Sequence, residues 1–205
     1  MSTSHRFLAV LLGAGLILSC GLALPAGQAQ PAKAEAPILV TSCGQSMGAT
    51  QIKVLLQQKL KLPFDFEPLA TPATLQAKVQ AGAPYKSMII VMGASLKGMG
   101  AAGISIDDEL ARAAALIAEA RKEGVKIIGA HVGGMKNRAQ GAAAGDTTDE
   151  QSIDAVGPNS NILLVCKEGN ADGRFTTISK GKNIPLIEAE KLLDLVPALE
   201  KLYGK

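Results

Sequence analysis

The chain has 205 residues, of which 47% are apolar, and a formal net charge of +3, so its length and composition fit one domain with an ordinary core. Aromatic residues make up 3% and tryptophan is absent, which leaves little for the stacking surfaces that bind sugars or single-stranded nucleic acid. Lysine and arginine are spread along the sequence without a basic block. We therefore expect no nucleic-acid partner, and membrane contact only through the N-terminal segment.

The first 29 residues are predicted to be a targeting leader. His5 and Arg6 give a short polar, basic start, and the stretch 7–24 (FLAVLLGAGLILSCGLAL) contains no charged residue. Residues 30–36 follow as a Pro/Ala-rich linker, and we expect a single folded domain over 37–205. The leader predicts an exported protein of the periplasm or cell envelope.

The sequence leaves three fates of the leader open. Cleavage after Ala29, where Gly27 and Ala29 are the small residues of the site, would release a soluble protein. The run Ile17-Leu18-Ser19-Cys20 also resembles a bacterial lipobox, in which Cys20 carries a lipid. The third fate is an uncleaved anchor, because about eighteen apolar residues nearly span a bilayer.

Short apolar runs rich in β-branched residues alternate with helical patterns over the rest of the chain. This alternation is typical of βαβ units, and runs that are apolar on both faces are typical of buried parallel strands. The predicted strands are Ile38–Ser42, Phe64–Glu67, Ser87–Met92, Lys126–His131, Ile162–Cys166 and Ile184–Ile187.

Helix ends are marked by capping residues between these strands. Thr71-Pro72 predicts an N-cap followed by proline at the first helical position, and Ser105 with Asp108 predicts a capping box. Thr148 with Gln151 predicts a second box. The last helix is expected over Ala189–Tyr203, with Pro197 kinking or restarting it.

The pattern as a whole predicts a single α/β domain with three layers and a mostly parallel, doubly wound sheet of flavodoxin or Rossmann type. The order of its strands stays open. In such sheets ligands bind beyond the carboxyl ends of the strands, so the segments that follow each strand are the candidate site.

Glycines and small polar residues dominate these segments, and few charged side chains accompany them. Lys97 is the charged residue of the flexible, glycine-dense loop 93–103, and Lys136 and Arg138 follow the fourth strand. The predicted ligand-binding residues are Ser42, Cys43, Gly44, Gln45, Ser46, Ser95, Lys97, Gly98, His131, Lys136, Glu168 and Asn170.

Each of these features also has a purely structural interpretation. The glycines can serve only tight turns, and His131 can be a hydrogen-bonded residue at a strand end. Lys136 and Arg138 can be solvated loop charges, and Asp172 is most simply an N-cap for the next helix.

Cys43 is the sharpest candidate for chemistry, because a thiol at a helix N-terminus can have a lowered pKa and act as a nucleophile. The alternative is a small residue packed in a turn. A disulfide between Cys43 and Cys166 is disfavoured, because strands that are not neighbours lie roughly 10–15 Å apart. A metal site from Cys43, His131 and Cys166 needs the same convergence, so we expect neither a metal nor a cofactor.

Three motifs follow the first, third and fifth predicted strands: S-C-G-Q-S at 42–46, K-G-M-G-A-A-G at 97–103 and E-G-N-A-D-G at 168–173. In combination they resemble an exported bacterial family described as domain of unknown function 6305. The resemblance extends from Pro37 to about Tyr203 and implies the fold and export. It assigns no catalytic residue, because the family has no established activity. Residues 138–148 are richer in Ala and Gly than the family pattern, which lowers the weight on Arg138.

The leading functional hypothesis is a non-catalytic exported domain that binds a small polar or anionic ligand with Lys97, Lys136 and Arg138. The alternative is a hydrolase or transferase with Cys43 or Ser46 as nucleophile and His131 as base. A third hypothesis is an interaction module tethered to a membrane through its leader.

Overall fold

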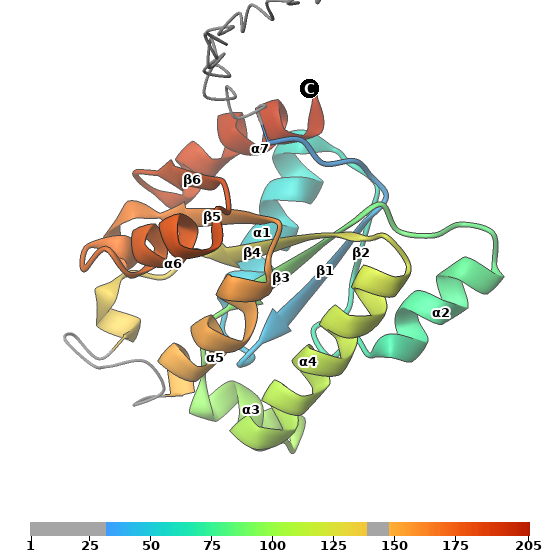
Figure 1. The fold of residues 1–205 in the computed structure, drawn as a ribbon, viewed down its shortest axis with the longest axis horizontal. Helices are drawn as coiled ribbons and strands as arrows, with labels where there is room; N and C mark the ends of the chain where they lie inside the picture. Colours follow the sequence, from blue (N-terminus) through green and yellow to red (C-terminus); the bar gives the residue numbers. More distant parts are fainter. Residues whose placement is uncertain (1–31, 139–147) are drawn as a thin grey trace, which may run out of the picture. The chain divides into compact units, whose positions relative to one another are not determined.

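The computed structural model describes residues 32–138 and 148–205. These form one six-stranded, all-parallel sheet with the order β2-β1-β3-β4-β5-β6 (Figure 1). The strands are β1 (Ile38–Cys43), β2 (Phe64–Phe66), β3 (Ser87–Met92), β4 (Lys126–His131), β5 (Ile162–Cys166) and β6 (Leu186–Ala189). The predicted α/β class is confirmed. The order of the first five strands is the flavodoxin-like one, with β6 added at the edge.

Helices cover both faces of this sheet. They are α1 (Gly48–Leu55), α2 (Pro72–Gln80), α3 (Leu96–Ala102), α4 (Ile106–Lys122), α5 (Thr148–Val156), α6 (Arg174–Lys182) and α7 (Leu195–Tyr203). Side chains of α2, α4, α5 and α6 share one buried core with one face of the strands, and those of α1 and α7 share a second core with the other. The doubly wound prediction is therefore confirmed.

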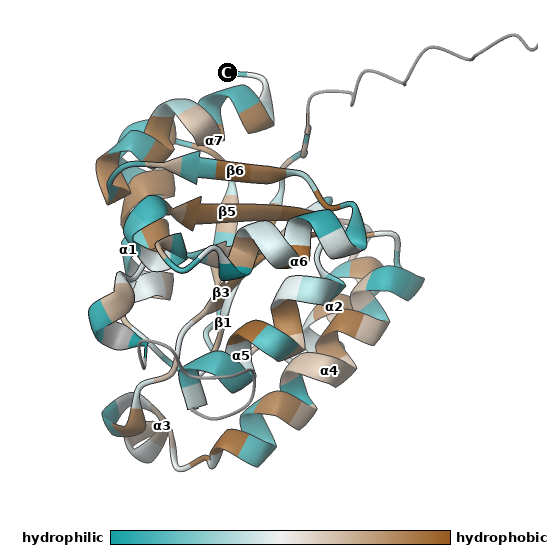
Figure 2. Cartoon of the chain, turned by 60° about the vertical axis from the view of Figure 1, so that its left-hand side comes forward, coloured by the Kyte–Doolittle hydropathy of each residue, from teal (hydrophilic) through white to brown (hydrophobic). Residues whose placement is uncertain are grey.

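The central strands are buried on both sides. In β1, Leu39 belongs to the first core and Val40 to the second, and both are fully buried. Figure 2 shows the same apolar character along β5, whereas the end of β6 is hydrophilic. Each Å² of apolar surface removed from water stabilises the fold by roughly 25 cal/mol, and burial of both strand faces explains the continuous apolar runs in the sequence.

The last strand lies two residues later than predicted. Pro185 has no N–H group to donate, although its carbonyl accepts a bond from the Leu163 N–H (2.9 Å). The N–H of Ile184 is bonded to the Ser179 carbonyl at the end of α6. Strand pairing therefore begins only at Leu186.

Two other predictions about local structure were wrong. The glycine-dense loop 93–103 contains helix α3, because the Ser95 hydroxyl accepts the Gly98 N–H (3.0 Å) and caps it. Helix α5 begins at Thr148 itself, so Thr148 is not its N-cap. The caps at Thr71 and Ser105 are confirmed. The last helix also begins later than predicted, because Ala189 ends β6 and α7 starts only at Leu195, after a 3-10 turn, with Pro197 in its first turn.

The described chain begins at the amino-terminal edge of the sheet. The Ala34 N–H donates to the Leu202 carbonyl (2.9 Å), and the Ser87 hydroxyl donates to the Glu35 carbonyl (2.6 Å). Residues 32–36, expected to belong to the linker, are therefore packed on the domain. Residues 32–205 form one compact unit that contains the whole sheet and both cores.

The predictions for the leader, including cleavage at Ala29 and lipidation at Cys20, fall outside the described residues. Within 32–138 and 148–205, no helix is both long enough and apolar enough to cross a bilayer.

Candidate functional site

A cavity of about 440 Å³ lies at the carboxyl-terminal edge of the sheet. It is formed by the segments that follow β1, β3 and β4, together with the start of α5. It therefore adjoins the point between β1 and β3 where the strand order reverses, the usual ligand position in this fold. The lining residues are Ser46, Met47, Gly48, Gln51, Met92, Gly93, Ala94, Ser95, His131, Val132, Gly133, Gly134 and Asp149.

The loop after β1 is held in place by a buried carboxylate from α4. Glu109 is fully buried, and its Oε1 accepts the Gly44 N–H (2.8 Å) and the Gln45 side-chain amide (2.7 Å). Its Oε2 accepts the Arg112 Nε–H (2.8 Å), and Arg112 also donates to the Ser42 carbonyl (2.5 Å). Because the carboxylate is paired and hydrogen-bonded on both oxygens, it fixes the backbone before α1.

The loop after β3 is held by the first turn of α5. Asp149 Oδ1 accepts the Ala94 N–H (2.7 Å), and the Ser152 hydroxyl oxygen accepts the Gly93 N–H (3.0 Å). Asp149 is 5% exposed. A carboxylate in the first turn of a helix is also favoured by the helix dipole. Helix α5 therefore builds one wall of the cavity.

His131, at the end of β4, is 1% exposed and faces Asp149, with 3.5 Å between His131 Nε2 and Asp149 Oδ2. Its Nδ1 has no hydrogen-bond partner among the described residues and is enclosed by Gly169, where a Cβ would lie 2.6 Å from it. The ring also packs on Phe175, with the centroids 5.1 Å apart. This geometry directs Nε2 at Asp149 and leaves no ring nitrogen aimed at Cys43.

Arg138 is part of a buried ionic network and not a solvated loop charge or a ligand-facing cation. Its guanidinium is 1% exposed and donates to Glu150 (2.5 Å), to Asp172 (2.8 Å) and to the Gly169 carbonyl (2.6 Å). Arg174 lies 2.7 Å from the second oxygen of Glu150. The prediction was wrong because the sequence did not reveal that Arg138 lies against the start of α5.

Cys43 and Cys166 are both buried free cysteines. Burial raises the pKa of the Cys43 thiol to about 12, the nearby Glu109 carboxylate adds to this, and Arg112 opposes it. Burial, with Glu168 and Asp194, also raises the pKa of Cys166. Two strands, β3 and β4, separate the strands that carry them. This environment favours the packed, structural interpretation of Cys43 over the nucleophilic one.

Three of the predicted site residues, Ser46, Ser95 and His131, line the cavity. Four other predicted residues hold the loops around the cavity in place. The Ser42 hydroxyl donates to the Pro68 carbonyl, and the Gly44 N–H and the Gln45 amide donate to Glu109. Gly98 packs so closely against Gln45 that a Cβ there would lie 2.2 Å from the Gln45 carbonyl oxygen.

The remaining predicted residues do not line the cavity. Lys97 and Lys136 are exposed side chains. Asn170 closes the start of α6, where its Oδ1 accepts the Phe175 N–H (2.8 Å). Asp172 accepts the Arg174 N–H (3.2 Å) and pairs with Arg138, so it joins the ionic network. Glu168 lies against Gly134, where a Cβ would approach its carboxyl carbon to 2.4 Å.

The charged residues that organise the loops around the cavity come from α4, α5 and α6 and were not predicted from the sequence: Glu109, Arg112, Asp149, Glu150 and Arg174. The spacing of Glu109 and Arg112 at i and i+3 was a usable signal for a pair on one helix face. Asp149 and Glu150 looked like ordinary acidic residues of a first helical turn. Within the described residues, no three His, Cys, Asp or Glu side chains are grouped to hold a metal ion.

We expect Cys43 to be alkylated by iodoacetamide at pH 8 at least about a hundredfold more slowly in the folded protein than in urea. The reason is that a thiol with a pKa near 12 is almost wholly protonated at that pH, whereas an unfolded thiol has a pKa near 8.5. Site-resolved mass spectrometry of a time course measures both rates. Equal rates in the two conditions would show that the folded thiol is accessible and ionised.

Comparison with known proteins gives one family. The model of a domain of unknown function, DUF6305, matches residues 35–203, which cover the whole sheet and the cavity. No curated protein matches the chain. The resemblance carried by the three loop motifs is thereby confirmed, and the chain belongs to the DUF6305 family.

Proposed function

We propose that the domain binds a small polar ligand in the cavity at the carboxyl-terminal edge of the sheet. The observation that carries the proposal is the cavity itself, whose volume of about 440 Å³ lies within the range of small-molecule sites. Its position beside the reversal of strand order is where parallel α/β sheets hold ligands.

Charge favours a neutral or hydrogen-donating ligand over an anion. Lys97 and Lys136 do not line the cavity, and Arg138 is committed to Glu150 and Asp172. Among the lining residues, Asp149 and His131 are the ionisable ones. An anion would approach the Asp149 carboxylate without a lysine or arginine in the lining to offset it.

The lining side chains supply hydrogen-bond groups for such a ligand. The hydroxyl oxygens of Ser46 and Ser95 each accept a backbone N–H, from Gly48 and Gly98, which leaves their O–H groups as donors. Gln51 adds an exposed amide at the first turn of α1. Hydroxyl and amide groups of a small metabolite match this set.

The environment of Cys43 does not favour the alternative in which its thiol is a nucleophile, because burial raises the pKa of that thiol to about 12. The leader supports a second part of the proposal, namely that the domain works outside the cytoplasm, in the periplasm or cell envelope.

Filling the cavity tests the proposal. Gln51→Trp places a large ring at the mouth of the cavity, whereas Gln58→Trp places the same ring on an exposed position outside the lining. We expect a panel of polyols, primary amides and neutral sugars to yield binders that shift the amide resonances of Gly93, Ala94 and Gly134. Gln51→Trp is expected to weaken these binders at least tenfold and Gln58→Trp to leave them unchanged, because only the first ring occupies ligand volume.

The measurement is an NMR titration of residues 32–205, confirmed by calorimetry. A panel without any binder contradicts the proposal. So does a binder whose affinity is the same in Gln51→Trp as in the unsubstituted domain, because that ligand would lie elsewhere.

A further inference from the structure

Lysines that are scattered in the sequence gather at the amino-terminal edge of the sheet, opposite the cavity. Lys61 precedes β2, Lys86 precedes β3 and Lys126 begins β4, and all three are exposed. Because all six strands run parallel, residues before their first positions meet at one edge. Lys33 and Lys205, also exposed, join them from the two ends of the described chain.

Hydrogen bonds bring these lysines together as two groups at this edge, Lys33 with Lys86 and Lys126, and Lys61 with Lys205. The Lys126 N–H donates to the Lys86 carbonyl (3.1 Å), and the Lys126 ammonium donates to the Lys33 carbonyl (2.6 Å). The Lys205 ammonium donates to the Leu60 carbonyl (2.8 Å), next to Lys61. We call Lys33, Lys61, Lys86, Lys126 and Lys205 the amino-edge lysine surface.

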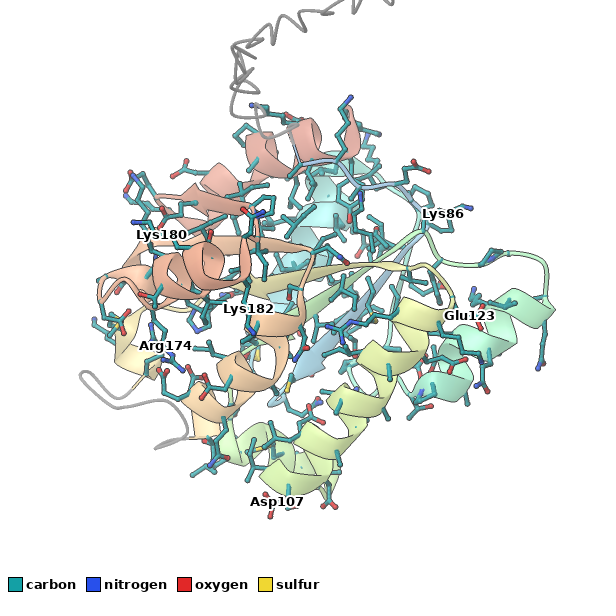
Figure 3. The ribbon with its side chains drawn as sticks, in the orientation of Figure 1. Lys86, Asp107, Glu123, Arg174, Lys180 and Lys182 are labelled. Atoms are coloured by element: carbon teal, nitrogen blue, oxygen red, sulfur yellow. The ribbon has the colours of Figure 1, made fainter. Side chains whose placement is uncertain are left out.

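Few acidic groups offset this surface. Glu35 is an exposed carboxylate beside it and Glu200, whose carbonyl accepts the Lys205 N–H, is half-buried, while Glu119 and Glu123 are paired with Lys122, and Asp65 with Lys78. No ion pair is formed by any of the five lysines within the described residues. In Figure 3, Lys86 is labelled at the upper right and Asp107 at the bottom, with Glu123 between them in height.

We infer that the amino-edge lysine surface docks on the anionic phospholipid headgroups of a membrane. Exposed lysines close to an anionic bilayer each add a favourable electrostatic contribution that falls off within a Debye length of about 10 Å. The contribution needs no basic block in the sequence, because it depends on where the ammonium groups lie in space.

The residues that precede the described domain favour a membrane as the partner of the lysine surface. The uncharged apolar stretch 7–24 is followed by only eight peptide steps to Ala32, which span at most about 28 Å. Ala34 is packed on Leu202 at this same edge. A leader held in a bilayer would therefore keep the lysine surface near the headgroups and direct the cavity away from them. A lipid on Cys20 would do so with a longer tether, since twelve peptide steps to Ala32 span at most about 43 Å. This inference does not depend on ligand binding in the cavity.

The test uses residues 32–205, which contain the complete sheet and both cores, so binding through the leader is excluded. Sedimentation with vesicles of equal parts phosphatidylglycerol and phosphatidylcholine in 20 mM salt measures partitioning. Lys61→Gln/Lys86→Gln/Lys126→Gln is compared with Lys97→Gln/Lys136→Gln/Lys167→Gln, which removes three exposed lysines outside the surface.

We expect the domain to bind the anionic vesicles, to release them at 500 mM salt, and not to bind pure phosphatidylcholine. The partition coefficient of the amino-edge triple variant should fall about a hundredfold, at roughly fivefold per lysine removed. That of the control variant should fall by well under tenfold. Equal losses in the two variants would overturn the inference. Absence of binding to the anionic vesicles would also overturn the inference. If the domain bound a 20-nucleotide DNA but not the vesicles, the lysine surface would be a nucleic-acid site instead.

Discussion

Arg138→Met is expected to lower the free energy of unfolding by about 3–5 kcal/mol, the range for breaking a buried ion pair by removing one partner. The Arg138 guanidinium is 1% exposed, and Glu150 beneath it is fully buried. Without Arg138, the Gly169 carbonyl and one oxygen of Glu150 lose their donor in a place that water does not reach. Urea denaturation followed by circular dichroism measures the change.

Arg121→Met is the matched control for this prediction. Arg121 is exposed and donates to Asn159 at the surface, so its loss should change stability by no more than about 0.5 kcal/mol. Replacing the pair together, as Arg138→Met/Glu150→Leu, should recover part of the loss, because the fully buried Glu150 carboxylate is removed with Arg138, whereas Asp172, which also loses Arg138, is 31% exposed. A loss as small for Arg138→Met as for Arg121→Met would mean that the network adds nothing to folding.

Gly44→Ala is expected to destabilise the domain by about 3 kcal/mol or more, since two penalties add. Gly44 has φ +104°, where side chains are rarely found, and its Cβ would lie 2.5 Å from the Gly93 carbonyl oxygen. The backbone of the β1 and β3 loops would have to separate. That movement would also disturb the Gly44 N–H bond to Glu109 and the wall of the cavity.

Gly82→Ala separates the two penalties. Gly82 also has a positive φ (+70°), but a Cβ added there would have no neighbouring atom within 4 Å. It should lose only about 1 kcal/mol, the cost of left-handed backbone for a residue with a side chain. Thermal and urea unfolding of both variants measure the difference. If Gly44→Ala is no worse than Gly82→Ala, the contact between the two loops is not tight in solution.

The sheet was predictable because its strands are apolar on both faces and short. Three predicted strands, Ser87–Met92, Lys126–His131 and Ile162–Cys166, have the observed bounds. Strand order was not predictable, since burial on both faces makes the inner strands alike in sequence. The glycines of α3 concealed a short helix, although Ser95 is an ordinary N-cap.

The position of the cavity was also predictable, but the charged residues around it were not. The rule that ligands bind beyond the strands located Ser46, Ser95 and His131 at the cavity. The partners of Arg138 and Gln45 lie on α5 and α4, 12 and 64 residues away in the sequence. Nothing local in a single sequence identifies such partners. For the same reason the amino-edge lysines were not predicted as a group.

Adjacent residues in the first turn of α5 face two different environments. Asp149 contacts the loop that borders the cavity, and Glu150 binds the buried Arg138 and the partly exposed Arg174. A ligand in the cavity and the arginines that pair with Glu150 would therefore both act on the first turn of α5. The local opening of that turn would be thermodynamically linked to ligand binding and to the ion pairs. If the domain binds the proposed ligand, Arg138 would influence ligand affinity without touching the ligand, and the bound ligand would in turn stabilise the ionic network. The proposed binding and the local folding of this region would then depend on one short helix.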